Sequence, residues 1–262
     1  MESQQRNNVR IVGRGNQPLI FAHGYGCDQN MWRKLVPAFE DRFRIILYDL
    51  VGCGRSDLSA YDRKKYETLH GHASDLCDIL TEHAGGPAVF VGHSVSATIG
   101  LLAGVARPDL FSRHVMIGPS PCYINDGDYV GGFTRADIQS LLETLDGNYL
   151  GWASAMAPTI MGAPEQPELR EELTNSFCAT DPDIAKHFAH VTFLSDNRKD
   201  VPKLTTPTLL LQCSEDIIAP RTVGDYLHQH LPNSTLRVID NVGHCPHLSA
   251  PDAIIAAMNQ FL

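Results

Sequence analysis

Ser94 stands in a short segment, GHSVS (92–96), whose composition could present a nucleophile. An apolar run precedes this segment and a helical pattern follows at once, within residues 88–106 (AVFVGHSVSATIGLLAGVA). A G-x-S-x-G nucleophile elbow requires this strand–turn–helix context, because its strained turn exposes the serine hydroxyl. Ser96 replaces the last glycine and is still small enough for the helix to pack closely on the strand. We therefore predict that Ser94 is a catalytic nucleophile.

A base and an acid are needed to activate a serine hydroxyl, and both follow in the chain in the order Ser, Asp, His. Asp216 comes after the apolar run TLLLQC (208–213), and His244 comes after TLRVID (235–240). Both lie just after predicted strands. In open α/β sheets the binding and active sites lie at the edge where the carboxyl ends of the strands meet. We expect His244 to accept the serine proton and Asp216 to orient the imidazole. Glu215 is the alternative acid; we prefer Asp216 because its shorter side chain holds the ring more tightly.

Two backbone N–H groups are expected to bind the oxyanion that forms during acyl transfer. One belongs to Val95, the residue after the nucleophile. The other should come from a loop after an early strand, and HGYG (23–26) follows the apolar run PLIFA (18–22) there. We assign it to Tyr25.

The elements that must position these residues are short apolar runs separated by segments of helical length. One such segment is 69–84, where apolar residues recur at helical spacing. Strands alternating with helices predict an α/β fold with a mostly parallel, doubly wound sheet. An antiparallel sheet needs hairpin turns, and the long helical segments between the strands leave no room for them. The predicted strands lie at 9–13, 18–24, 43–49, 88–93, 114–118, 208–213 and 235–240.

The alternation stops between residues 119 and 195, where helix formers dominate, as in 136–157 and 168–177. We predict a helical cap (119–195) inserted into an α/β core formed by 1–118 and 196–262.

Charge and composition exclude several classes of protein. With 21 Lys and Arg against 30 Asp and Glu, the formal net charge of −9 gives no basic surface for nucleic acid or anionic membranes. The N-terminus has no apolar signal segment, and no apolar run is long enough to cross a membrane. The seven scattered cysteines are typical of free thiols in a reducing compartment. We expect a cytoplasmic protein that binds neither nucleic acid nor membrane.

No cofactor or metal is expected. The turn GCGRS (52–56) lacks the third glycine of a dinucleotide fingerprint. The histidine pairs at 70 and 72 and at 228 and 230 are two residues apart on predicted helices, so they point to different faces and are expected to be exposed. Cys245, beside His244, is expected to be a packed thiol and not a nucleophile.

The chain resembles the RsbQ-like branch of the α/β hydrolases, which includes a bacterial stress-signalling hydrolase and the plant strigolactone and karrikin receptors. The resemblance covers nearly the whole chain. It rests on HGYGCDQNMW (23–32), YDLVGCGRSDLSAYD (48–62), VGHSVSA (91–97), GPSPCYIND (118–126), QCSEDIIAP (212–220), YLHQHLP (226–232) and GHCPHLS (243–249).

This resemblance implies an α/β-hydrolase fold whose cap of four helices covers a deep apolar pocket. It places Phe133, Trp152 and Phe193 in that pocket, with Tyr25 where phenylalanine is usual. Met156 stands where the karrikin receptors have phenylalanine, which predicts a wider or more adaptable pocket.

Two functions are consistent with these residues. The first is a serine hydrolase of small hydrophobic esters, lactones or butenolide enol ethers. The second is a ligand-gated signalling protein in which slow hydrolysis or covalent ligand retention drives partner binding; the bacterial relative implies a phosphatase with a sensory domain as that partner. An acyltransferase or perhydrolase would use the same residues with another nucleophile. Ser94 excludes dehalogenases and epoxide hydrolases, which use a carboxylate.

Overall fold

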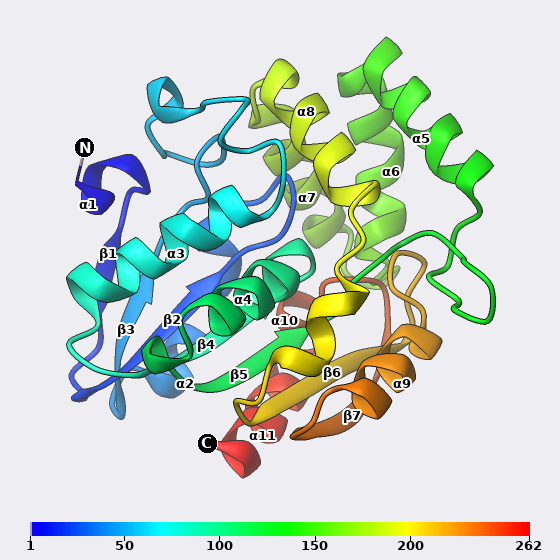
Figure 1. Ribbon diagram of the computed structural model, residues 1–262. Coiled ribbons are helices and arrows are strands. Elements are labelled where there is room, and N and C mark those ends of the chain that lie inside the picture. The colour runs from blue at the N-terminus through cyan, green and yellow to red at the C-terminus, as the bar shows by residue number, and fades with distance from the viewer. Residues whose placement is uncertain (1) are drawn as a thin grey trace.

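The computed structural model describes residues 2–262 and is built on one seven-stranded sheet (Figure 1). The strand order is β1-β3-β2-β4-β5-β6-β7. β1 pairs antiparallel with β3, and the remaining neighbours are parallel, so the predicted mostly parallel sheet is confirmed. Each predicted strand overlaps an observed one. The strands are β1 (Arg10–Val12), β2 (Gln17–Ala22), β3 (Phe43–Leu47), β4 (Ala88–His93), β5 (Phe111–Ile117), β6 (Thr208–Glu215) and β7 (Ser234–Val242).

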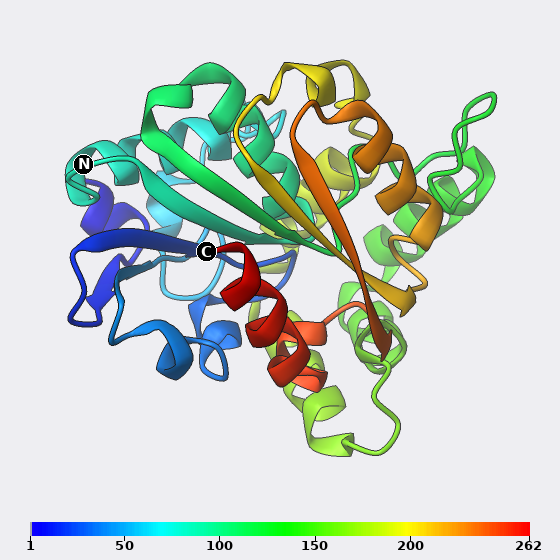
Figure 2. The ribbon, with the colours of Figure 1, turned by 90° about the horizontal axis from the view of Figure 1, so that it is seen from below.

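Helices cover both faces of the sheet, which is why its central strands are apolar along their whole length (Figure 2). Ile20 packs in the cluster that includes α3, α4 and α9, whereas its neighbours Leu19 and Phe21 face α2 and α11. The predicted helix at 69–84 is α3. These helices are α2 (Val36–Phe39), α3 (His70–His83), α4 (Val95–Ala106), α9 (Arg221–His230) and α11 (Pro251–Phe261); the short α1 (Ser3–Arg6) and α10 (Pro246–Ser249) complete the core.

Four helices lie between β5 and β6, and they stand together beside the sheet (Figure 1). The predicted helical run 136–157 is divided in two at Asn148. The Asn148 side chain accepts a hydrogen bond from the N–H of Gly151 at 3.0 Å and so begins a second helix. The four helices are α5 (Arg135–Gly147), α6 (Tyr149–Met161), α7 (Pro167–Ala179) and α8 (Pro182–Phe193).

The histidines of the helical pairs differ in burial. His228 and His230 are exposed, as expected. The prediction of an exposed His72 is wrong, because this residue is 1% exposed and its ring stacks on that of Tyr66. A lone histidine on the inner face of a helix reads as polar in the sequence although its ring packs like an aromatic one. In residues 2–262, no three His, Cys, Asp or Glu side chains are grouped to hold a metal, and no helix is long and apolar enough to span a membrane.

Candidate active site

Ser94 lies at the turn between β4 and α4, in a backbone conformation that few side chains adopt. Its φ of 58° and ψ of −126° place it among the few non-glycine residues with positive φ. Its N–H donates to the carbonyl oxygen of Ile117 on β5 at 2.8 Å, which holds the strained turn in place. A Cβ on Gly92 would lie 2.8 Å from the carbonyl oxygen of Ser96, so the first glycine of the segment is required.

Ser96, the departure from the general elbow pattern, has a partner of its own. Its hydroxyl is fully buried and donates to the carbonyl oxygen of His23. His23 begins the loop that contains Tyr25. The serine therefore joins the helix after the elbow to the loop expected to supply the second oxyanion donor, a bond that glycine could not make.

Asp216, His244 and Ser94 form one hydrogen-bonded chain. Nδ1 of His244 lies 2.6 Å from Oδ2 of Asp216, and Nε2 lies 2.8 Å from Oγ of Ser94. The other carboxylate oxygen of Asp216 accepts from the N–H groups of Ile218 at 2.8 Å and Ala219 at 3.1 Å. These two bonds fix the carboxylate, and the carboxylate in turn fixes the ring with Nδ1 as donor. Nε2 is then left as an acceptor for the serine proton.

The sheet brings this acid and this base together. Glu215 at the end of β6 pairs with Val242 at the end of β7, so the two chains leave the sheet side by side. Asp216 and His244 follow within two residues. The Asp216 carboxylate is fully buried, whereas Glu215, the alternative acid, is exposed and contributes only its backbone carbonyl, to Gly243. The geometry therefore favours Asp216.

The imidazole of His244 is closely surrounded on the remaining sides. Gly118, with φ of +57°, faces it so closely that an added Cβ would lie 3.0 Å from Cε1. Nε2 of His93, the residue before the nucleophile, lies 2.8 Å from the carbonyl oxygen of His244. The two imidazole rings are tilted by 48° with their centroids 4.9 Å apart. Burial and the neighbouring histidines hold the pKa of His93 well below its usual value, so this ring is neutral.

The two expected oxyanion donors lie in positions that leave their N–H groups free. Val95 is the first residue of α4, where the helix offers no acceptor of its own. The N–H of Tyr25 makes no hydrogen bond to any other residue of 2–262. The positive end of the α4 dipole adds to the attraction for an anion beside Ser94.

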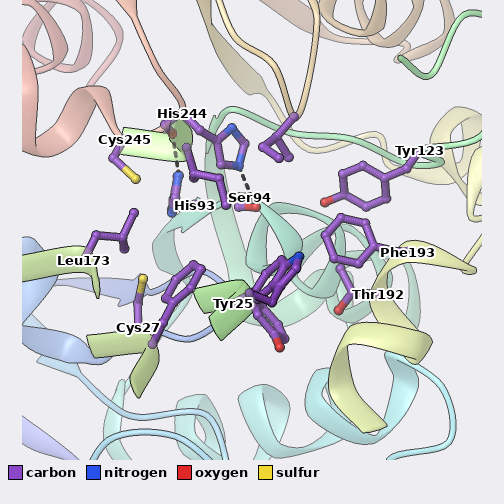
Figure 3. A pocket seen from close by; sticks show the side chains of 14 residues that line it. Tyr25, Cys27, His93, Ser94, Tyr123, Leu173, Thr192, Phe193, His244 and Cys245 are labelled. Atoms are coloured by element: carbon purple, nitrogen blue, oxygen red, sulfur yellow. Dashed lines mark hydrogen bonds between the residues drawn. The ribbon is translucent and has the colours of Figure 1, made fainter. Parts of the chain in front are cut away.

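A narrow cavity adjoins the Ser94 hydroxyl, and about 30 Å³ of it is open to the centre of a water molecule. This is room for about two waters. Aromatic side chains from the core and from α6, α7 and α8 surround it (Figure 3). It is lined by Tyr25, Cys27, His93, Ser94, Tyr123, Trp152, Ile160, Leu173, Phe177, Thr192, Phe193, Ile218, His244 and Cys245.

Comparison with known proteins identifies the family. Residues 19–257 match the model described as the Alpha/beta hydrolase family. The chain belongs to this family. It is 38% identical to the Karrikin insensitive 2 receptor CA of Petunia hybrida, over 97% of this chain and 95% of the receptor. It is 37% identical to Strigolactone esterase D14 of Arabidopsis thaliana, over 97% of this chain and 94% of that protein. A solved structure of a hydrolase from Oleispira antarctica is similar, with 42% identity, a TM-score of 0.96, and coverage of 100% of this chain and 97% of the other.

Three of the aromatic residues expected in the pocket of this alpha/beta hydrolase line the cavity: Tyr25, Trp152 and Phe193. Phe133 and Met156 do not line it. Both are half-buried against the apolar cluster that includes α5, α6, α7 and α8. The cavity is narrow, so the width expected at Met156 is not seen.

Several lining residues were missed in the sequence. Phe177 and Leu173 lie on α7, in a segment that read only as helical, and Tyr123 lies in the segment GPSPCYIND (118–126) that the resemblance had marked. Burial raises the pKa of the Tyr123 hydroxyl and of the Cys27 and Cys245 thiols, so these groups are neutral. Cys245, 1% exposed, is a packed thiol that also borders the cavity.

Proposed function

We propose that this alpha/beta hydrolase is a serine hydrolase of small hydrophobic esters, lactones or butenolide enol ethers. The observation that carries the proposal is the hydrogen-bonded chain from Asp216 through His244 to Ser94, at 2.6 Å and 2.8 Å, with Ser94 on a strained turn at the cavity. Serine is activated in this way for acyl transfer in unrelated folds.

The reaction proceeds by two acyl transfers. Ser94 Oγ attacks the carbonyl carbon while its proton passes to Nε2 of His244. The tetrahedral intermediate collapses, His244 returns the proton to the leaving oxygen, and an alcohol or enol departs from an acyl-enzyme. A water molecule then loses its proton to His244, attacks the acyl carbon and releases the acid and the Ser94 hydroxyl. Asp216 stays ionised and stabilises the imidazolium.

The N–H groups of Val95 and Tyr25 hold the oxyanion in both steps. Donors of this kind act because they are already oriented and shielded from bulk water, and each lowers the barrier by about 3–4 kcal/mol. The strained turn at Ser94 and the adjacent start of α4 support this assignment for Val95.

The cavity supports an apolar substrate with few polar groups. Apart from the active-site residues, its polar lining is limited to neutral hydroxyl and thiol groups, so a charged acyl group has no partner among the lining residues. We propose that residues 119–195 act as a cap over the core formed by 1–118 and 196–262. Because the narrow cavity holds only about two waters, the cap must move to admit an ester.

The test is turnover of p-nitrophenyl acetate by the parent protein and by Ser94→Ala. Loss of turnover in the variant, with unchanged folding by circular dichroism, supports the proposal. Turnover that persists in Ser94→Ala contradicts it.

A second function, a ligand-gated signalling protein, is favoured by one observation: relatives at 38% identity over nearly the full chain are named as receptors. The RsbQ-like resemblance points to a phosphatase with a sensory domain as the partner, in stress signalling. The seven free thiols favour a reducing cytoplasm as its setting. A melting temperature that falls on ligand addition would support this function; no effect of any ligand on stability or partner binding would contradict it.

A further inference from the structure

The loop that carries Tyr25 is tied to the cap by two hydrogen bonds. The Tyr25 hydroxyl donates to the carbonyl oxygen of Ala185 on α8 at 2.9 Å. The Ser176 hydroxyl on α7 donates to the carbonyl oxygen of Gly26 at 2.8 Å. Tyr25 and Gly26, two consecutive residues of this loop, therefore each contact a different helix of the cap.

The receiving helix is firmly built at this point. Asp181 caps α8, and its side chain accepts from the N–H groups of Asp183 at 3.0 Å and Ile184 at 3.1 Å. Ala185 lies one residue further on and is itself buried. A displacement of Ala185 is therefore a displacement of the whole first turn of α8.

The ring of Tyr25, a core residue, is surrounded by aromatic rings of the cap helices. Its centroid lies 6.3 Å from that of Trp152 on α6 and 5.7 Å from that of Phe177 on α7. On α8 it lies 5.7 Å from Phe188 and 6.5 Å from Phe193. One core residue therefore contacts three of the four cap helices.

Gly26 permits this close approach. Its φ is +67°, and a Cβ at this position would lie 2.6 Å from the ring of Phe177. The loop and α7 are consequently in direct contact. A movement of α7 therefore removes a packing contact that holds the loop in position.

An ester needs more space than this cavity offers, since its roughly 30 Å³ hold only about two waters. Substrate entry therefore requires the cap to move away from the Tyr25 loop and break these contacts. The cap residues Trp152, Phe177 and Phe193, which surround Tyr25, also line the cavity. When the cap lifts, the Tyr25 hydroxyl loses Ala185, and the loop that holds the Tyr25 N–H loses its packing.

We propose that the Tyr25 hydroxyl is a latch that couples closure of the cap to assembly of the oxyanion hole, so the hole is complete only when the cap is closed over a bound ester. This rests on the proposed hydrolase function. The hydroxyl acts through position and touches no reacting atom; the backbone N–H of the same residue binds the oxyanion. Open enzyme therefore binds esters without acylating.

The experiment compares Tyr25→Phe with Tyr61→Phe. Tyr61 is a matched control, because its hydroxyl also joins a core loop to α8, through Nδ1 of His187 at 2.7 Å, but it does not line the cavity. Two readouts are used. Peptide mapping after reaction with methyl methanethiosulfonate gives the labelling rate of Cys27 and Cys245, which line the cavity. Stopped flow with p-nitrophenyl acetate gives the acylation rate constant.

Loss of one net hydrogen bond corresponds to about a fivefold change in the closure equilibrium. Tyr25→Phe is expected to label both cavity thiols up to about fivefold faster and to acylate more slowly than the parent, whereas Tyr61→Phe acylates at the parent rate. Ser176→Ala, which removes the second bond to the loop, is expected to change both readouts in the same direction as Tyr25→Phe.

Parent-like labelling and acylation in Tyr25→Phe would overturn the latch, as would an equal fall in acylation in both tyrosine variants. A parent protein with no acylation dependent on Ser94 would overturn the hydrolase function instead. In that case the labelling rates still decide whether the Tyr25 hydroxyl holds the cap closed.

Discussion

The Nε2 atom of His93 donates to the backbone carbonyl oxygen of His244, 2.8 Å away and 151 residues later in the chain. The carbonyl can only accept, so this ring is protonated on Nε2, and its buried Nδ1 has no partner among residues 2–262. The residue before the nucleophile thus holds the loop that carries the base. This bond helps to fix the distance between Ser94 and His244, although His93 is not itself part of the hydrogen-bonded series Asp216–His244–Ser94.

Replacing His93 by Leu should lower kcat about tenfold, because the buried carbonyl of His244 loses its donor and the loop shifts; an unpaired buried acceptor costs about 1–3 kcal/mol. KM should change little, since His93 only borders the cavity. His93→Gln retains an N–H donor and should recover most of kcat. Steady-state kinetics on p-nitrophenyl acetate measure both. Equal losses in the Leu and Gln variants would contradict a positioning role.

Asp216→Asn should reduce turnover about ten-thousandfold at neutral pH, the effect known for the equivalent change in another serine hydrolase. The amide cannot stabilise the imidazolium and favours the wrong tautomer of His244. The matched control is Glu215→Gln, which neutralises the exposed carboxylate next to Asp216 and should turn over at the parent rate. Near-normal turnover in Asp216→Asn together with a large loss in Glu215→Gln would assign the acid to Glu215.

Gly118→Ala should lower turnover, because the new methyl group would lie 3.0 Å from Cε1 of His244 and displace the ring. Gly127→Ala is the control: Gly127 has nearly the same φ, +56° against +57°, but nothing lies within 4 Å of the added atom. Both variants should lose about 1–2 kcal/mol of unfolding free energy from the left-handed backbone. Urea denaturation and kinetics separate the effects. A loss of turnover in both would show that strain alone, and not contact with His244, is responsible.

His114→Phe should remove part of the acid sensitivity of the fold. Burial lowers the pKa of His114 to about 3, and neither ring nitrogen has a partner in residues 2–262. The unfolded chain binds this proton near pH 6.5 and the folded protein does not, so stability falls as the pH drops from 6.5 towards 3. The slope is at most about 1.4 kcal/mol per pH unit for this group.

The phenylalanine variant has no such titrating group, so it does not lose this part of its stability in acid. Its ring can still pack against Phe90 and Phe111, whose rings lie 5.4 Å and 4.8 Å from that of His114. Urea denaturation of parent and variant at pH 7, 5.5 and 4.5 measures the difference. The unfolding free energy of the variant, relative to that of the parent, should increase as the pH falls. A constant difference at all three pH values would contradict the assignment.

The core of the site was predictable from the sequence because strands, turns and their order are local properties. The apolar runs before Ser94, Asp216 and His244 predict parallel strands, and the carboxyl ends of parallel strands meet at one edge. What joins these residues in space is the parallel sheet that the alternation of strands and helices predicts.

The cavity was less predictable because its walls depend on how the four helices between β5 and β6 pack on one another. Helical spacing shows that α7 has an apolar face, but it does not show that Phe177 reaches Tyr25. It likewise does not show that Met156 and Phe133 lie outside the cavity lining. His72 and His114 were also beyond reach, since a buried neutral imidazole and an exposed one have the same sequence signal.

The central claim is that Ser94 forms an acyl-enzyme under the control of His244 and Asp216. Its most direct test is intact-mass spectrometry of the protein quenched during reaction with p-nitrophenyl acetate, with Ser94→Ala alongside. The account predicts that the parent gains the mass of one acetyl group, mapped to the peptide that contains Ser94, and that the variant gains none. An acetyl group on the variant, or on another residue of the parent with Ser94 unmodified, would contradict it.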